Sequence, residues 1–272
     1  MDPRRLSALN KYNKPVNAMD LPTNVRLMLH GDHGAWKTVT ACRIAGLSGR
    51  VLLYTTDEDW KSLKNHPEIM SNVDVMTHQE PAQLRFLVEA LADGVEGYDQ
   101  YKGFVLDSAN GWVLDLLDNL MENTQISESK GRTKILPRAG KPAAAKLIAD
   151  LDLLLAEQSD FNTIRNKMAK LLRYLNKFDG HVIINSHTRY ASSNNDKLAK
   201  VDTLRPDLPE QTFHTIARKM DAIGYMQADD RGATIDFKKS HTLATKSRMD
   251  VLNGQKLSVD NAIKRIASWI ER

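Results

Sequence analysis

The sequence predicts an α/β fold in which a mainly parallel β-sheet is covered by helices on both faces, with antiparallel strands near the C-terminus. Short apolar runs alternate with segments of helical spacing over residues 25–186, which is typical of parallel strands joined by helical crossovers. Polar side chains directly follow several of these runs, where such folds bind their ligands. After residue 220 the pattern changes to short strands separated by short turns, which favours antiparallel pairing.

The strands are predicted from apolar and β-branched runs bounded by turn residues. They span residues 25–30, 51–56, 73–77, 103–107 and 181–186, and then 222–227, 233–239 and 241–246. Apolar residues at helical spacing predict helices over residues 37–47, 81–91 and 259–270, and over 145–178 as two segments. A further helix is expected to begin at residue 59.

The length, the apolar runs and the cysteine count limit the class of protein. The 272 residues suffice for one large α/β domain, and we expect a single domain with an N-terminal extension over residues 1–22. No apolar run approaches the roughly 18 residues that cross a bilayer, and residues 1–15 lack the apolar segment of a signal peptide. The one cysteine, Cys42, cannot form an internal disulfide. We therefore expect a cytoplasmic protein without a membrane partner.

A glycine-containing turn lies between the first strand and the first helix, which is the context of a phosphate-binding loop. Backbone N–H groups in such a turn point at phosphate oxygens, and the helix N-terminus adds positive potential. Lys37 is placed to reach the β- and γ-phosphates, and the Thr38 hydroxyl to bind Mg²⁺. The residues expected to bind the nucleotide are Gly31, Asp32, His33, Gly34, Ala35, Trp36, Lys37, Thr38 and Val39.

Trp36 departs from the phosphate-loop pattern, which has glycine immediately before the lysine. An indole at a crowded backbone position either moves the loop or slows turnover. The alternative is an accidental Gly-Lys-Thr-like loop at a strand–helix junction. The indole itself either stacks on a ring or fills a gap at the surface.

Carboxylates follow two of the predicted strands. Asp107 ends the run 104–107, as the acid that orders the magnesium shell does in nucleotide-binding folds. Asp57 and Glu58 follow the second strand, and Glu58 is the favoured residue for orienting an attacking water. The alternative reading of Asp57 and Glu58 is a pair of helix N-cap residues.

The fifth strand ends in Asn185, Ser186 and His187. A polar side chain there can sense the γ-phosphate and pass its presence to the following loop, and we assign that role to His187. A histidine at a strand end is equally well explained as a partly buried, hydrogen-bonded residue.

With these pieces in order, the chain resembles the RecA superfamily, and within it the phage-encoded, single-domain RecA-like ATPases of single-strand annealing and recombination. The resemblance covers residues 25–248. It rests on Gly31–Thr38 and on the segments 54–58, 101–108, 182–187, 221–225 and 245–248. It implies a RecA-like core, ATP and Mg²⁺ as cofactors, and the host cytoplasm if the source is a phage.

The resemblance also implies roles for single residues. Lys37 and Thr38 match the phosphate-loop pair, Glu58 the catalytic glutamate and Asp107 the magnesium-ordering acid. Lys246 and Arg248 look like the Lys-x-Arg pair that reaches the γ-phosphate bound by a neighbouring subunit, so hydrolysis depends on assembly into a ring or filament. A solvated strand end is the alternative for this pair.

Members of that superfamily contact DNA through two mobile loops, which match residues 123–145 and 190–212 here. The first loop overlaps residues 130–146, which hold six basic residues and no acidic one, and Arg189, Lys197, Lys200 and Arg205 lie in or beside the second. Such side chains neutralise phosphates without reading sequence. The residues expected to bind DNA are Lys130, Arg132, Lys134, Arg138, Lys141, Arg189, Lys197 and Lys200. Two ordinary solvated loops are the alternative.

The leading hypothesis is therefore an oligomeric ATPase that binds single-stranded DNA in phage-type recombination, annealing, replication or repair. A single-stranded-DNA-binding protein is a further expected partner. A helicase-like or loader ATPase is the second hypothesis. The third is a sensor or structural protein that binds ATP and barely turns it over, which Trp36 favours.

Overall fold

The structure is a computed structural model that describes residues 23–126, 158–192, 202–230, 232–240 and 242–272. Its strands are β1 (Arg26–Gly31), β2 (Arg50–Thr55), β3 (Val73–Thr77), β4 (Tyr101–Asp107), β5 (His181–Ser186), β6 (Thr188–Ser192), β7 (Asp202–Pro206), β8 (Ala222–Asp229), β9 (Gly232–Asp236), β10 (Lys246–Ser247) and β11 (Lys256–Ser258). The main sheet has the order β11-β9-β8-β1-β5-β4-β2-β3, with β10 also paired to β8.

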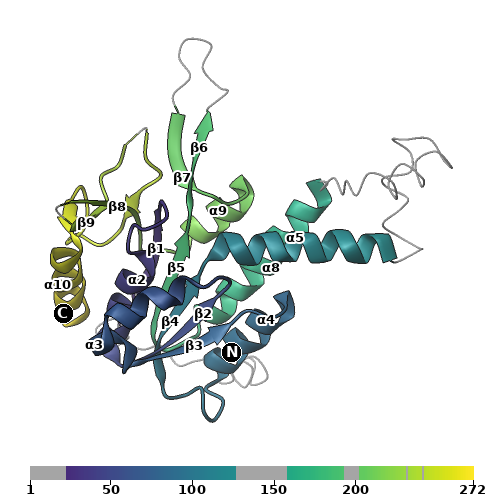
Figure 1. Cartoon of the computed structure of the whole chain (residues 1–272), viewed down its shortest axis with the longest axis horizontal. Coiled ribbons are helices and arrows are strands. Elements are labelled where there is room, and N and C mark those ends of the chain that lie inside the picture. Colours follow the sequence, from purple (N-terminus) through teal and green to yellow (C-terminus); the bar gives the residue numbers. More distant parts are fainter. Residues whose placement is uncertain (1–22, 127–157, 193–201, 231, 241) are drawn as a thin grey trace, which may run out of the picture.

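The helices pack on both faces of this sheet (Figure 1). They are α2 (Lys37–Ala45), η2 (Gly46–Ser48), η3 (Asp59–Asn65), α3 (Pro67–Met70), α4 (Pro81–Asp93), α5 (Ala109–Ile126), α8 (Gln158–Leu175), α9 (Glu210–Ala217) and α10 (Val259–Ile270). No helix of the described ranges is long and apolar enough to cross a membrane.

Six neighbouring strands of the main sheet are parallel, in the spatial order β8, β1, β5, β4, β2 and β3. The strands β9, β10 and β11 pair antiparallel. Successive side chains of a strand point to opposite faces. Met28 accordingly packs in the cluster that includes α4, α5 and α8, whereas Leu27 and Leu29 pack in the cluster that includes α2 and α10. The predicted fold class, with a mainly parallel sheet covered on both faces and C-terminal antiparallel strands, is confirmed.

The last helix shows why the sequence pattern was sufficient there. The Ser258 hydroxyl accepts a hydrogen bond from the Asn261 N–H and caps the first turn. Ala262 and Ile266 are fully buried, and Ile263 and Ile270 pack against the same core. The helix has the predicted bounds because local capping and an apolar face agree.

Three regions differ from expectation. The helix α5 was not predicted, and its last residues, 123–126, fall in the first expected loop. The second expected loop, 190–212, includes arms of a β6–β7 hairpin and the start of α9. Of the expected strand 241–246, Lys246 pairs in the main sheet together with Ser247, and Leu243 forms an isolated bridge with Leu204. Of the helix expected at 145–178, residues 158–175 form α8, and residues 145–157 lie outside the described residues.

His181 is a buried base at the start of β5. Its Nδ1 accepts a hydrogen bond from the Val25 N–H at 3.1 Å, so Nε2 carries the proton and donates to Ser48 Oγ at 2.7 Å. Burial, assisted by the nearby charge of Arg26, lowers the pKa of His181 from 6.5 to about 4.

We predict that this histidine makes folding sensitive to acid. Because the pKa is lower in the folded protein than in the unfolded chain, stability is complete above pH 6.5 and is lost as the pH falls toward 4. At pH 5 the loss is about 2 kcal/mol relative to pH 7.5. Urea unfolding of the native chain and of His181→Gln at both pH values measures it. An equal acid loss in His181→Gln would contradict the prediction.

Candidate functional site

The turn between β1 and α2 has the backbone of a tight loop. Gly34 and Trp36 both have positive φ, at 75° and 65°, and Trp36 is the N-cap residue of α2. Gly31 closes β1 where it pairs with Met226 of β8, and a Cβ there would lie 2.4 Å from the Met226 carbonyl oxygen. Only glycine lets these two strands approach at this point.

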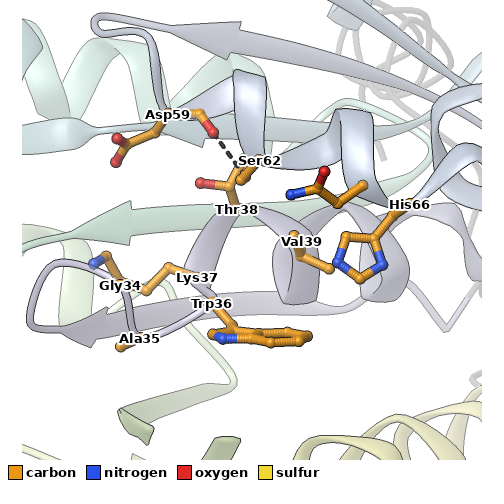
Figure 2. A pocket seen from close by; sticks show the side chains of 10 residues that line it. Gly34, Ala35, Trp36, Lys37, Thr38, Val39, Asp59, Ser62 and His66 are labelled. Carbon is orange, nitrogen blue, oxygen red and sulfur yellow. Dashed lines mark hydrogen bonds between the residues drawn. The ribbon is translucent and has the colours of Figure 1, made fainter.

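The side chain of Lys37 folds back over this turn. Its Nζ donates hydrogen bonds to the carbonyl oxygens of Gly31 at 3.0 Å and Asp32 at 2.8 Å. The residue is buried, and desolvation lowers the pKa of Lys37, whereas the charges of Asp107, Asp59, Asp32 and Asp57 raise it. Figure 2 shows Lys37 with Gly34, Ala35 and Trp36 of the turn. The ammonium is thus held where a phosphate group can meet it.

Thr38 and Asp107 join α2 to β4. Thr38 Oγ1 donates a hydrogen bond of 2.5 Å to Asp107 Oδ2, and both residues are buried. Burial raises the pKa of Asp107 to about 6, with Asp57 and Asp59 adding to the rise, while the hydrogen bond from Thr38 opposes it. A hydroxyl and a carboxylate are hard oxygen donors of the kind Mg²⁺ prefers. These two residues therefore fit the magnesium site expected from the sequence.

The acidic residues after β2 divide into two kinds. Asp57 Oδ1 accepts a hydrogen bond from the Asp59 N–H at 3.0 Å, as in an Asx turn, whereas Glu58 is the N-cap residue of η3 and its side chain makes no capping hydrogen bond. The side chain of Glu58 is 78% exposed and forms an ion pair with Lys61. Asp57 and Asp59 act on Lys37 electrostatically. The catalytic role assigned to Glu58 stays a prediction, because among the described residues no hydrogen bond or ion pair joins its side chain to the phosphate loop.

The polar end of β5 lies beside the phosphate loop. The rings of His187 and His33 stack with centroids 4.0 Å apart, and the His187 N–H donates to Asn110 Oδ1 at 3.1 Å. Burial and the charges of Lys37 and His33 lower the pKa of His187. Asn185 is fully buried, and its side chain stabilises the charged form of Asp107 although neither amide atom has a partner at hydrogen-bond geometry.

A cavity of about 470 Å³ opens beside the start of α2. One wall is residues 34–39, and the other is Asp59, Ser62, Asn65 and His66 from η3 and its end. Trp36 is 52% exposed, and its ring meets His66 edge-on with centroids 5.6 Å apart (Figure 2). The departure from the phosphate-loop pattern thus places an aromatic face at the cavity.

Lys246 and Arg248 lie near the amino end of β8, whereas the phosphate loop follows the carboxyl end of β1. Lys246 pairs with Ile223 near the amino end of β8, and its Nζ donates to the carbonyl oxygens of Ala217 and Met220 after α9. Arg248 donates to the Arg218 carbonyl oxygen at 3.1 Å. The structure does not bring this pair to the phosphate loop of its own chain. Its action on a neighbouring subunit stays a prediction.

The basic residues expected to bind DNA are described only in part. Arg189 donates to the Leu208 carbonyl oxygen at 2.8 Å and lies 3.6 Å from Asp207, and Arg205 lies 4.0 Å from Glu210. These contacts stabilise the base of the β6–β7 hairpin. The other expected residues lie outside the described residues: Lys130, Arg132, Lys134, Arg138, Lys141, Lys197 and Lys200.

Sequence reasoning missed two side chains of this site. Asp59 acts on both Lys37 and Asp107, and Asn110 anchors the backbone of His187. The available signal for Asp59 was its position two residues after Asp57, directly beyond a strand. Asn110 carried no signal, because the helix that holds it was not predicted.

Together the parallel sheet, the loop around Lys37 and the Thr38–Asp107 pair define a P-loop nucleotide-binding protein of the NTPase class. The family model of the AAA domain matches residues 23–249, and the chain belongs to that family. The match confirms the expected P-loop class. A search of curated proteins gave no match.

We predict that the close approach of β1 and β8 makes Gly31 intolerant of a side chain. Gly31→Ala is expected to lower the free energy of unfolding by about 2 kcal/mol or more, because the added Cβ would overlap a backbone oxygen that cannot turn aside. Gly46→Ala is the matched control, since its Cβ meets nothing nearer than 3.5 Å. Urea unfolding compares the two variants. Equal stability of both would contradict the strand geometry.

Proposed function

We propose that this protein binds ATP with Mg²⁺ at the turn between β1 and α2 and hydrolyses it. The observation that carries the proposal is the convergence of the Lys37 ammonium and the Thr38–Asp107 pair at this turn. A cation, a hydroxyl and a carboxylate held together at a helix N-terminus form a site for a metal-bound polyphosphate.

Each residue has a distinct task in this proposal. Lys37 exchanges its two carbonyl partners for phosphate oxygens, which costs little because one set of hydrogen bonds replaces another. Thr38 and Asp107 hold Mg²⁺, which neutralises charge on the phosphates. Glu58, whose side chain is 78% exposed and paired with Lys61 at the surface, turns inward to orient water.

The cavity beside α2 is the proposed site of the base. Its volume of about 470 Å³ is in the range of small-molecule sites. Trp36 presents a half-exposed indole there, and aromatic stacking of a base contributes about 1–3 kcal/mol. In this arrangement the residue that replaces glycine contributes affinity for the nucleotide.

We further propose that turnover is coupled to DNA and to self-association, as in the phage-type recombination and annealing ATPases that the sequence resembles. The basic, acid-free stretch that contains Lys130 and Lys141 supports DNA binding through phosphate contacts. Arg248 is exposed, and one terminal nitrogen of its guanidinium donates to the Arg218 carbonyl oxygen, which leaves other donors able to meet a neighbouring subunit.

A nucleotide-binding protein with little turnover is the second candidate. Two observations favour it. Trp36 occupies a left-handed backbone conformation that glycine adopts more readily, and Lys246 is engaged by carbonyl oxygens of its own chain. Phosphate release separates the two candidates.

We predict that phosphate release from ATP and Mg²⁺ rises with single-stranded DNA and depends on Lys37. Lys37→Ala is expected to lower the rate by about 100-fold or more, because it removes charge stabilisation of the transferring phosphate. Lys102→Ala is the control, since Lys102 pairs with Asp179 at the other edge of the sheet. No release from any sample, with nucleotide still bound, would leave the second candidate.

We predict that Trp36→Gly weakens ATP binding by about tenfold through loss of stacking. Tripolyphosphate, which lacks a base, should bind both proteins alike, because it uses only the phosphate loop. Competition against a fluorescent nucleotide measures both ligands. Tighter ATP binding by Trp36→Gly would mean that the indole obstructs the loop and does not stack.

A further inference from the structure

Three metal-ligating side chains meet beside the phosphate loop without taking part in the Thr38–Asp107 pair. Asp57, Asp59 and His187 each offer one ligand atom, and these atoms all lie within 4.8 Å of one another. Asp57 lies in the turn after β2, Asp59 is the first residue of η3, and the imidazole follows β5. The set is therefore assembled by the tertiary fold from two distant parts of the chain.

The backbone holds these groups in place. The Asp59 N–H donates to Asp57 Oδ1, and the His187 N–H donates to Asn110 Oδ1. The His33 ring stacks on His187 and fixes the plane of the imidazole. His187 Nδ1 is shielded from solvent and has no hydrogen-bond partner. The imidazole of His187 is thus positioned by its surroundings, while its Nδ1 atom stays without a hydrogen-bond partner.

The local charge favours a cation. Four carboxylates, those of Asp107, Asp59, Asp32 and Asp57, act on the single ammonium of Lys37. Asp57 and Asp59 also act on the buried Asp107. Lys61, the basic residue that follows them, pairs with Glu58 instead. Negative charge gathered in this way attracts a divalent ion, and it opposes a polyphosphate unless it is neutralised.

We propose that Asp57, Asp59 and His187 form a second divalent-cation site, distinct from the Thr38–Asp107 site and selective for a transition metal such as Mn²⁺ over Mg²⁺. Imidazole nitrogen binds transition metals well, whereas Mg²⁺ prefers oxygen ligands. Two ligands about 2.1 Å from one ion lie at most about 4.2 Å apart. Rotation of the exposed Asp59 carboxylate closes the remaining gap. The site needs no nucleotide, so it stands whether or not ATP is hydrolysed.

The test is Mn²⁺ binding to the full, nucleotide-free chain, measured by the electron paramagnetic resonance signal of the free ion. We expect Asp59→Asn and His187→Asn each to weaken Mn²⁺ binding at least about tenfold, because even loss of a group that only orients a metal ligand costs about 10–100-fold in affinity. Asp107→Asn should retain the binding, which separates this site from the proposed magnesium site. Glu58→Gln removes the same charge from a neighbouring residue outside the set and should bind Mn²⁺ normally.

Two outcomes would overturn the proposal. The first is no Mn²⁺ bound by the native chain. The second is binding lost in Asp107→Asn but kept in His187→Asn, which would place the ion at the Thr38–Asp107 pair. Circular dichroism checks the fold of each variant, and Asp59→Asn alters only an exposed side chain. Competition by Mg²⁺ at equal concentration should displace less than half of the Mn²⁺.

Discussion

The parallel alignment of six strands is the constraint on which the rest of this structure depends. Parallel strands end at the same edge of a sheet, so residues far apart in sequence are brought together there. Lys37 follows β1, Asp57 follows β2, Asp107 ends β4 and His187 follows β5. Helices on both faces bury the strands between these ends. The site therefore exists because the sheet is parallel, and one antiparallel strand among the four would remove its contribution.

The balance of charge at this edge links the structure to function. One buried ammonium faces several carboxylates, and desolvation and attraction act on the pKa of Lys37 in opposite directions. The hydrogen bond between Thr38 and Asp107 occupies both oxygens that are suited to Mg²⁺. Carbonyl oxygens of Gly31 and Asp32 satisfy the Lys37 ammonium, and the Asp107 carboxylate satisfies the Thr38 hydroxyl. These hydrogen bonds hold the three polar side chains in place at the start of α2.

Trp36 connects the loop to the cavity. Its backbone adopts the left-handed conformation, and its ring lies against His66 at the wall formed by η3. A tryptophan in this conformation costs about 1–2 kcal/mol, which the surrounding loop and helix must offset. The residue that made the loop look imperfect in sequence is the one that shapes the neighbouring cavity. Its position gives a physical reason for a sequence that departs from the usual pattern.

The sequence by itself determined the strands of the parallel sheet, the phosphate loop and the amphipathic helix α10, because local periodicity and capping specify them. Only the tertiary structure decided that β8 pairs parallel with β1, and that Lys246 binds the carbonyl oxygens after α9. It also decided that Asp59 and Asn110 join the site, since contacts between residues far apart in the chain leave no periodic signal. The helix α5 was missed because Asn110 and Gly111 weaken its first turn, and burial of Trp112 and Leu116 against the core supplies the stability that local propensity lacks.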